Sequence, residues 1–237
     1  MISVCMATHN GEKYIKEQLD SVLCQLGKDD EIIISDDDST DSTVAIVTGY
    51  KDSRITVYRN VKRKGVTGNF ENALIHAGGD YIFLSDQDDV WKENKVRVCV
   101  EKLNDCDVVV SDCTVVDDGL QVIAPSFFEK NNTRKGLVQN LYHNSYMGCC
   151  MAFRRTLLQR SLPFPKHIPV HDVWIGFVAG LFYTTRFIPH ALVLYRRHGN
   201  NSTPTSQPSH YRVWKKITFR WNLLRYIPLL LVRRKNN

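Results

Sequence analysis

The chain has 237 residues, of which 43% are hydrophobic and 24% charged, and this balance is typical of a soluble globular protein and excludes a disordered or fibrous one. The apolar run at 2–7 is too short for a signal peptide and follows no basic residue, so we expect a cytoplasmic protein. Seven cysteines without a C-x-x-C pair argue against a disulfide framework and a thiolate zinc site.

The net charge of +6 is concentrated in one segment. Eight basic residues and no acidic one follow Ser209, so the rest of the chain carries 23 basic and 25 acidic side chains. Binding to phosphates along a nucleic acid needs a basic footprint on the folded surface. We therefore expect no nucleic-acid partner.

In the first half, short apolar runs bounded by Asp, Asn and Gly alternate with stretches of helical period. The pattern predicts an α/β fold with an open, mostly parallel sheet and helices on both faces. Strands are expected at 2–7, 31–35, 55–59 and 81–85, and helices from about residue 12, at 42–50 and at 69–77.

The second half is less regular. We expect a helix at 91–103, a hairpin turn at Asp118-Gly119 and a short helix at 172–180. Further strands are expected at 108–111, 147–153 and 182–188. A stretch rich in Asn, Ser, Thr and Pro at 199–209 is read as a linker to the basic segment.

That basic segment, residues 209–237, has apolar residues at helical spacing between Tyr211 and Tyr226, with basic residues at other positions. A basic helix with tryptophans on its apolar side suits an anionic membrane surface, so we expect peripheral contact with the cytoplasmic face of the cell membrane. The alternative is a helix that packs on the body with its charges in solvent.

Polar clusters follow three of the predicted strands. They are Thr8-His9-Asn10, Asp36-Asp37-Asp38 and Asp86-Gln87-Asp88-Asp89. Ligands of open parallel sheets bind beyond the carboxyl ends of the strands, and neighbouring acidic clusters there favour a divalent cation such as Mg²⁺ or Mn²⁺. The alternative reading is helix capping and turn formation. No dinucleotide-binding or P-loop glycine pattern is present.

Five segments resemble family 2 of the glycosyltransferases, which have the GT-A fold. They match in order and spacing over about residues 2–201: A-T-H-N-G-E-K-Y from Ala7, S-D-D-D-S-T-D from Ser35, F-L-S-D-Q-D-D-V-W from Phe83, H-D-V-W from His171 and Y-R-R-H-G-N-N from Tyr195. The S-D-Q-D-D-x-W and Y-R-x-H-G-N signatures are most similar to the rhamnosyltransferase-like branch, which serves bacterial surface-polysaccharide synthesis. The resemblance implies one domain over 1–201, with a nucleotide-sugar-binding half at 1–104 and an acceptor-binding half at 105–201.

The resemblance also implies roles for single residues. Asp88 matches the position in the D-x-D motif that binds the metal, His198 matches a histidine that approaches the metal or diphosphate, and Asp172 matches the general base. The matched positions on the nucleotide-sugar donor are Thr8, Asn10, Asp37, Asn69 and Asp86. This sequence departs from the family pattern at Asp38, where Gly or Asn is usual, and at His171, where Glu is common.

These roles imply an inverting, metal-dependent transfer of a sugar, with rhamnose as one candidate, to a hydroxyl of a glycan or a lipid-linked saccharide. A metal ion stabilises the departing diphosphate, and a carboxylate accepts the proton of the attacking hydroxyl. Two alternatives stay open. The segment from Asp36 to Thr40 also fits the nucleophile loop of haloacid-dehalogenase-like phosphatases, and the chain could bind a sugar nucleotide without catalysis.

Overall fold

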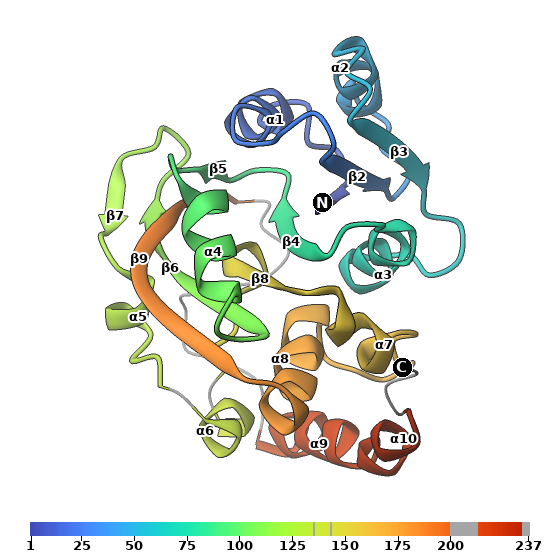
Figure 1. Ribbon diagram of the computed structural model, residues 1–237, viewed down its shortest axis with the longest axis vertical. Coiled ribbons are helices and arrows are strands. Elements are labelled where there is room, and N and C mark those ends of the chain that lie inside the picture. Colours follow the sequence, from blue (N-terminus) through green and yellow to red (C-terminus); the bar gives the residue numbers. More distant parts are fainter. Residues whose placement is uncertain (135, 143, 200–212, 234–237) are drawn as a thin grey trace.

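The computed structural model describes residues 1–237 except 135, 143, 200–212 and 234–237 (Figure 1). Its centre is a curled sheet with the strand order β3-β2-β1-β4-β8-β6-β9-β5, and β7 pairs with β6 outside this path. The strands are β1 (Ile2–Thr8), β2 (Glu31–Asp36), β3 (Ile55–Arg59), β4 (Tyr81–Asp86), β5 (Val90–Trp91), β6 (Val108–Val116), β7 (Val122–Ala124), β8 (Met151–Arg154) and β9 (Thr185–Arg196).

The first four strands confirm the predicted parallel half. β1 lies between β2 and β4, β2 pairs with β3, and all three pairings are parallel. The central residues of β1, β2 and β4 are buried apolar side chains, because helices cover both faces of this part of the sheet. The carboxyl ends of these strands, and the polar residues that follow them, therefore meet at one edge.

The second half differs from the expected mostly parallel sheet. β8 is antiparallel to both β4 and β6, β5 is antiparallel to β9, and only β6 with β9 is parallel. The turn at Asp118-Gly119 does join an antiparallel pair, β6 and β7, as predicted. The sheet is thus mixed, because hairpin and long crossover connections replace the repeating strand–helix unit.

Several predicted bounds in this half are wrong. The helix expected from residue 91 begins at Lys95, because Trp91 pairs with Val193 in the sheet. The strand expected at 147–153 begins at Met151 and follows a 3₁₀ turn, η1 (Gly148–Cys150). The strand expected at 182–188 begins at Thr185 and continues to Arg196, because Phe182 ends a helix.

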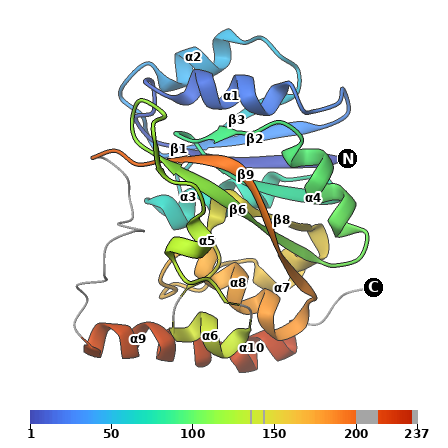
Figure 2. The same ribbon diagram turned by 90° about the vertical axis from the view of Figure 1, so that its left-hand side faces the viewer.

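The helices form layers on the two faces of the sheet (Figure 2). α1 and α2 lie on one face, and α3 packs against β1 and β2 on the other, in contact with α8. The helices of the body are α1 (Ile15–Leu23), α2 (Thr43–Gly49), α3 (Val66–His76), α4 (Lys95–Leu103), α5 (Phe127–Lys130), α6 (Leu137–Tyr142), α7 (Leu158–Ser161) after η2 (Arg155–Leu157), and α8 (His171–Phe182).

The basic segment folds into α9 (Val213–Leu224) and α10 (Ile227–Val232), which lie at the end of the molecule opposite α1 and α2 (Figure 2). The segment packs on the body, since Leu223 and Leu230 are buried and the Tyr226 ring meets Trp174 of α8 edge-on at 6.0 Å. The predicted linker, apart from Gly199, lies outside the described residues. None of the described helices is long and apolar enough to cross a bilayer.

Candidate active site

The loops after β1 and β4 are held together at the carboxyl edge of the sheet. The Gln87 side chain accepts a hydrogen bond from the His9 backbone N–H at 2.8 Å and donates one to the His9 carbonyl at 2.9 Å. A Cβ atom on Gly11 would lie 2.3 Å from Gln87 Oε1, so a larger residue there would displace the Gln87 amide from these hydrogen bonds. The Gln87 side-chain amide thus pairs with the His9 backbone as a neighbouring strand would. It joins the two loops and fixes the start of the D-x-D segment.

Thr8 and Asn69, both predicted to contact the donor, are buried beneath this edge. Thr8 Oγ1 donates to Asp36 Oδ1 at 2.8 Å, and Asn69 Nδ2 donates to the Thr8 carbonyl at 2.9 Å. The amide oxygen of Asn69 has no hydrogen-bond partner among the described residues. These contacts join β1, β2 and α3 into a platform.

Asp37 lies on this platform, in the loop after β2. Its carboxylate accepts hydrogen bonds from Asn60 Nδ2 at 2.9 Å and from the Gly65 backbone N–H at 2.7 Å. Lys64 lies 3.6 Å from the same carboxylate. Each carboxylate oxygen keeps a lone pair for a ligand, and its partners fix the orientation of the group.

Two residues near Asp37 have left-handed backbone conformations. Asp38, the departure from the family pattern, has φ of 60° and pairs with Lys64 and Arg59, and these two hydrogen-bonded cations lower the pKa of its carboxyl. Asn10 has φ of 49°, and its amide oxygen accepts the Thr40 backbone N–H at 2.8 Å. In this structure the Asn10 side chain therefore holds the neighbouring loop.

The two predicted metal ligands meet. His198 Nε2 lies 2.7 Å from Asp88 Oδ2, although the residues are 110 positions apart in the sequence. Both side chains are partly open to solvent, with exposures of 11% and 14%. The His198 ring stacks on Tyr14 at a centroid distance of 4.8 Å. A carboxylate oxygen and an imidazole nitrogen that converge in this way fit a divalent ion, and the mixed pair suits Mn²⁺ better than Mg²⁺.

A second acidic cluster lies beneath this pair. Ligand atoms of Asp86, Asp89 and Cys149 lie within 4.8 Å of one another. Burial, followed by the charge of Asp88, raises the pKa of Asp86 to about 8 and that of Asp89 well above its usual range. Burial thus disfavours the charged form of both carboxyls, which is the form that binds a cation, and the third ligand atom of this cluster is a buried thiol.

Asp172, the predicted base, lies in the first turn of α8, in the second half of the chain. Its Oδ1 accepts the Val173 backbone N–H at 2.6 Å, and burial raises its pKa to about 6. Gly148 lies close by, since a Cβ atom there would be 3.6 Å from Asp172 Cβ and 2.9 Å from His171 Nε2. A carboxylate with a pKa near 6 is ionised at neutral pH and is a stronger base than a solvated one.

His171, the second departure from the family pattern, is buried and packs beside α3. Its ring stacks on Phe70 with centroids 3.9 Å apart, and neither ring nitrogen has a hydrogen-bond partner among the described residues. Burial lowers its pKa to about 3, so the imidazole is neutral.

Three further residues shape the site but were not singled out in the sequence. Gln87 and Arg196 lie inside quoted motifs, which was the available signal for them. Lys95 had no such signal: it is fully buried, donates to the Cys149 carbonyl at 2.5 Å and lies 4.1 Å from the centre of the Trp91 ring.

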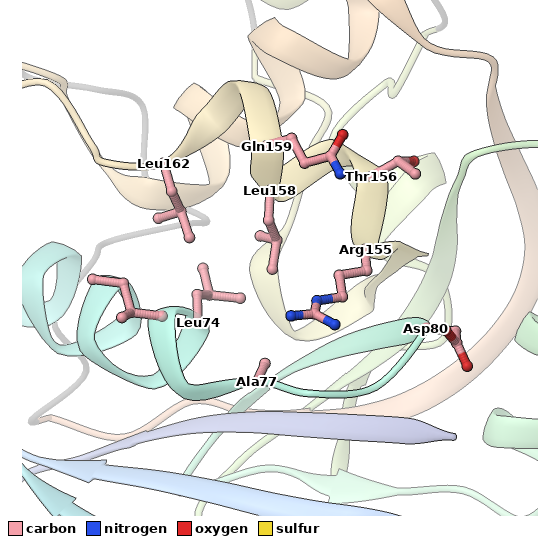
Figure 3. A pocket seen from close by; sticks show the side chains of 9 residues that line it. Leu74, Ala77, Asp80, Arg155, Thr156, Leu158, Gln159 and Leu162 are labelled. Carbon is pink, nitrogen blue, oxygen red and sulfur yellow. The ribbon is translucent and has the colours of Figure 1, made fainter. Parts of the chain in front are cut away.

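A groove of about 610 Å³ lies away from these residues (Figure 3). Its lining includes Leu74 and Ala77 near the end of α3, Asp80 before β4, and Arg155 and Leu158 of η2 and α7. Because Asp80 precedes β4, the groove lies toward the amino ends of the strands. It is therefore separate from the edge that carries Asp88 and His198.

The chain was compared with known proteins. The model of "Glycosyl transferase family 2" matches residues 3–162. A UDP-Glc:alpha-D-GlcNAc-diphosphoundecaprenol beta-1,3-glucosyltransferase, WfgD of Escherichia coli, is 30% identical over 74% of this chain and 69% of that protein. The dTDP-rhamnosyl transferase RfbG of Shigella flexneri is 30% identical over 83% of this chain and 72% of that protein.

Solved structures share the architecture. TarS residues 1–349 of S. aureus with UDP-GlcNAc superpose with a TM-score of 0.72 at 21% identity, covering 100% of this chain and 68% of that one. The mannosyltransferase PcManGT from Pyrobaculum calidifontis, with GDP-Man and Mn²⁺, superposes with a TM-score of 0.64 at 19% identity, covering 97% of this chain and 68% of that one.

The phosphatase alternative has no support in these matches. The order of the site motifs, the curled mixed sheet and the family match together place this chain in glycosyl transferase family 2, as a glycosyltransferase with the GT-A fold.

Proposed function

We propose that this enzyme moves a sugar from a nucleotide-diphospho-sugar to a hydroxyl group, with inversion at the anomeric carbon and a divalent metal ion. The observation that carries the proposal is the meeting of Asp88 with His198 at the carboxyl edge of the sheet. Burial, and after it the charges of Asp88 and Asp172, raise the pKa of Asp86, so Asp172 lies within electrostatic range of the same edge. Groups for the leaving diphosphate and for the acceptor hydroxyl thus come together.

Each group has a task in this reaction. Asp88 and His198 would hold Mn²⁺ or Mg²⁺, which stabilises negative charge on the departing diphosphate when bound. Asp37, oriented by Asn60 and Gly65, accepts hydrogen bonds from the nucleoside. Asp172 accepts the proton of the acceptor hydroxyl as that oxygen attacks the anomeric carbon from the face opposite the diphosphate.

The first experiment is calorimetric binding of UDP, dTDP and GDP, each with and without Mn²⁺, to the wild type and to Asp88→Ala. We expect one nucleotide to bind in a Mn²⁺-dependent manner and the variant to lose that dependence. A Lys or Arg clamp would give metal-independent binding instead and contradict the proposal. The nucleotide that binds narrows the choice of donor sugar. Binding of dTDP would favour rhamnose, because RfbG is named a dTDP-rhamnosyl transferase.

We further propose that the enzyme acts in cell-surface polysaccharide synthesis, on a lipid-linked saccharide at the inner face of the cell membrane. WfgD is named for an acceptor on diphosphoundecaprenol, which is a membrane lipid. In this chain the surface of α9 and α10 leaves large apolar side chains in solvent beside basic ones. They are Trp221 (65% exposed), Leu224, Leu229, Leu231 and Val232 (81%). With no acidic residue after Ser209, this surface suits anionic lipid.

Vesicle sedimentation tests this location. The double variant Trp221→Ser/Leu231→Ser removes two exposed apolar side chains, and we expect it to weaken binding to phosphatidylglycerol vesicles by at least about tenfold. Val122→Ser/Ile123→Ser is the matched control, because these apolar residues of β7 are also more than half exposed. Equal binding by the wild type and the α9–α10 variant would contradict the proposed membrane contact.

A further inference from the structure

Arg196, the last residue of β9, is a buried cation that contacts three separate segments. Its side chain is 4% exposed. Nε donates to the Asp88 carbonyl at 2.8 Å, Nη1 donates to the Asp118 carbonyl at 2.6 Å, and Nη2 pairs with the Glu17 carboxylate. The guanidinium therefore links the D-x-D loop, the hairpin turn after β6, and α1.

The backbone of Arg196 contacts the same loop. Its N–H donates to Asp89 Oδ1 at 3.0 Å. The antiparallel register of β5 with β9, in which Val90 lies opposite Leu194, places Asp88 opposite Arg196 when continued by two residues. Because His198 follows Arg196 by only two positions, one residue holds both the loop that carries Asp88 and the strand end that carries His198.

Tyr14 provides a second link between the same groups. Its ring lies 4.9 Å from the Arg196 guanidinium and stacks on the His198 ring. Its hydroxyl donates to Asp118 Oδ1 at 2.5 Å, so the ring is fixed from the hairpin side as well. The imidazole plane of His198 is thus set by an aromatic ring that Arg196 and Asp118 hold in place.

We propose that Arg196 is the positioning residue of the metal–diphosphate site, which sets Asp88 and His198 in register for one cation. This inference rests on the proposed function. Arg196 acts through the Asp88 backbone and through Tyr14 and does not itself touch the metal. Groups that orient metal ligands are worth about 10–100-fold in metal affinity or activity. A lysine has one nitrogen and cannot replace a planar fork that serves three acceptors.

The test is the affinity of the protein for Mn²⁺ in the presence of a saturating concentration of the nucleotide that the wild type binds. We expect Arg196→Lys to raise the dissociation constant for Mn²⁺ by about 10–100-fold. Turnover at saturating Mn²⁺ should fall by less than about threefold, so the loss appears in the Mn²⁺ concentration needed for half-maximal activity. A role limited to stability would lower the melting temperature and leave this Mn²⁺ dependence unchanged.

Two further variants complete the experiment. Glu17→Gln keeps the shape of a half-exposed partner and removes its charge, and we expect Mn²⁺ affinity to fall by about three- to tenfold. It decides the question if Arg196→Lys does not fold. Arg186→Lys is the control, and we expect it to bind Mn²⁺ as the wild type does. Arg186 is also on β9, but its side chain is half exposed and forms a loose ion pair with Asp105 at 3.6 Å.

The outcomes separate the two proposals. If the wild type binds Mn²⁺ with nucleotide and a folded Arg196→Lys binds it within about twofold of the wild type, the positioning role is wrong and the metal site stands. If Arg196→Lys does not fold and Glu17→Gln binds Mn²⁺ like the wild type, the positioning role is also wrong. If the wild type shows no Mn²⁺-dependent nucleotide binding, the proposed metal site fails and the positioning role fails with it.

Discussion

From β1 to β4 the chain adds parallel strands with helices between them, whereas from β5 onward every strand except β7, the hairpin partner of β6, pairs with a segment far away in the sequence. The donor platform of the first half is built from consecutive loops, which Thr8, Asn69 and Asp37 connect by short hydrogen bonds. The second half contributes Asp172 and His198 from separate elements. We propose that the regular half serves binding and that the irregular half contributes groups for the chemical step.

The largest expected effect on activity comes from removing Asp172, the proposed base in the irregular half. Asp172→Asn keeps the size of the side chain and removes its ability to accept a proton, so kcat should fall by about 10²–10⁴-fold. Binding of the donor nucleotide, measured by calorimetry, should change by less than about twofold. A loss of nucleotide binding in this variant would show that the two halves do not divide the work in this way.

Two substitutions in α10 test whether this C-terminal helix is part of the folded body. Leu230 of α10 is fully buried, and Leu230→Ala should lower the free energy of unfolding by about 2–5 kcal/mol. Leu231 is 60% exposed, so Leu231→Ala should change that free energy by less than about 0.5 kcal/mol. Urea unfolding measures both. Equal stability of the two variants would mean that α10 adds nothing to the body.

A variant of the regular half should show the opposite kinetic pattern to Asp172→Asn. Asp37→Ala removes the acceptor for Asn60 and Gly65, and we expect the nucleotide dissociation constant to rise by about 10–100-fold. Turnover at saturating donor should change by less than about threefold. Asp105→Ala, on an exposed carboxylate, is the control. A fall in kcat that matches the loss of affinity would contradict a binding role for this half.

The pH dependence of kcat/KM sharpens the assignment of the base. Burial raises the pKa of Asp172 to about 6, and the base acts only as a carboxylate. As the pH falls through 6 the group takes up a proton, so kcat/KM should fall about tenfold for each further pH unit. A solvated aspartate would move this limb to about pH 4. Steady-state kinetics between pH 4.5 and 8 distinguishes the two.

Local pattern was sufficient for much of the regular half. The strands at 2–7, 31–35 and 81–85 are predicted within a residue or two, because burial on both faces makes each a nearly continuous apolar run. The strand at 55–59 lies at the edge of the sheet and is only half-buried, and its bounds are also predicted correctly. The hairpin turn at Asp118-Gly119 depends on its own residues and was also predicted. Trp91 was assigned to a helix, because its pairing with Val193 is a contact across 102 positions that no local pattern contains.

By itself, the sequence determined the parallel half of the sheet, the polar residues at its carboxyl edge and the order of the site motifs, since these follow from local periodicity and from spacing along the chain. Only the tertiary structure decided that His198 meets Asp88, that Asp172 is buried enough to have a raised pKa, and that Arg196 contacts the Asp88 carbonyl. Such properties arise when distant segments pack together and exclude water, and a pattern of neighbouring residues does not encode them.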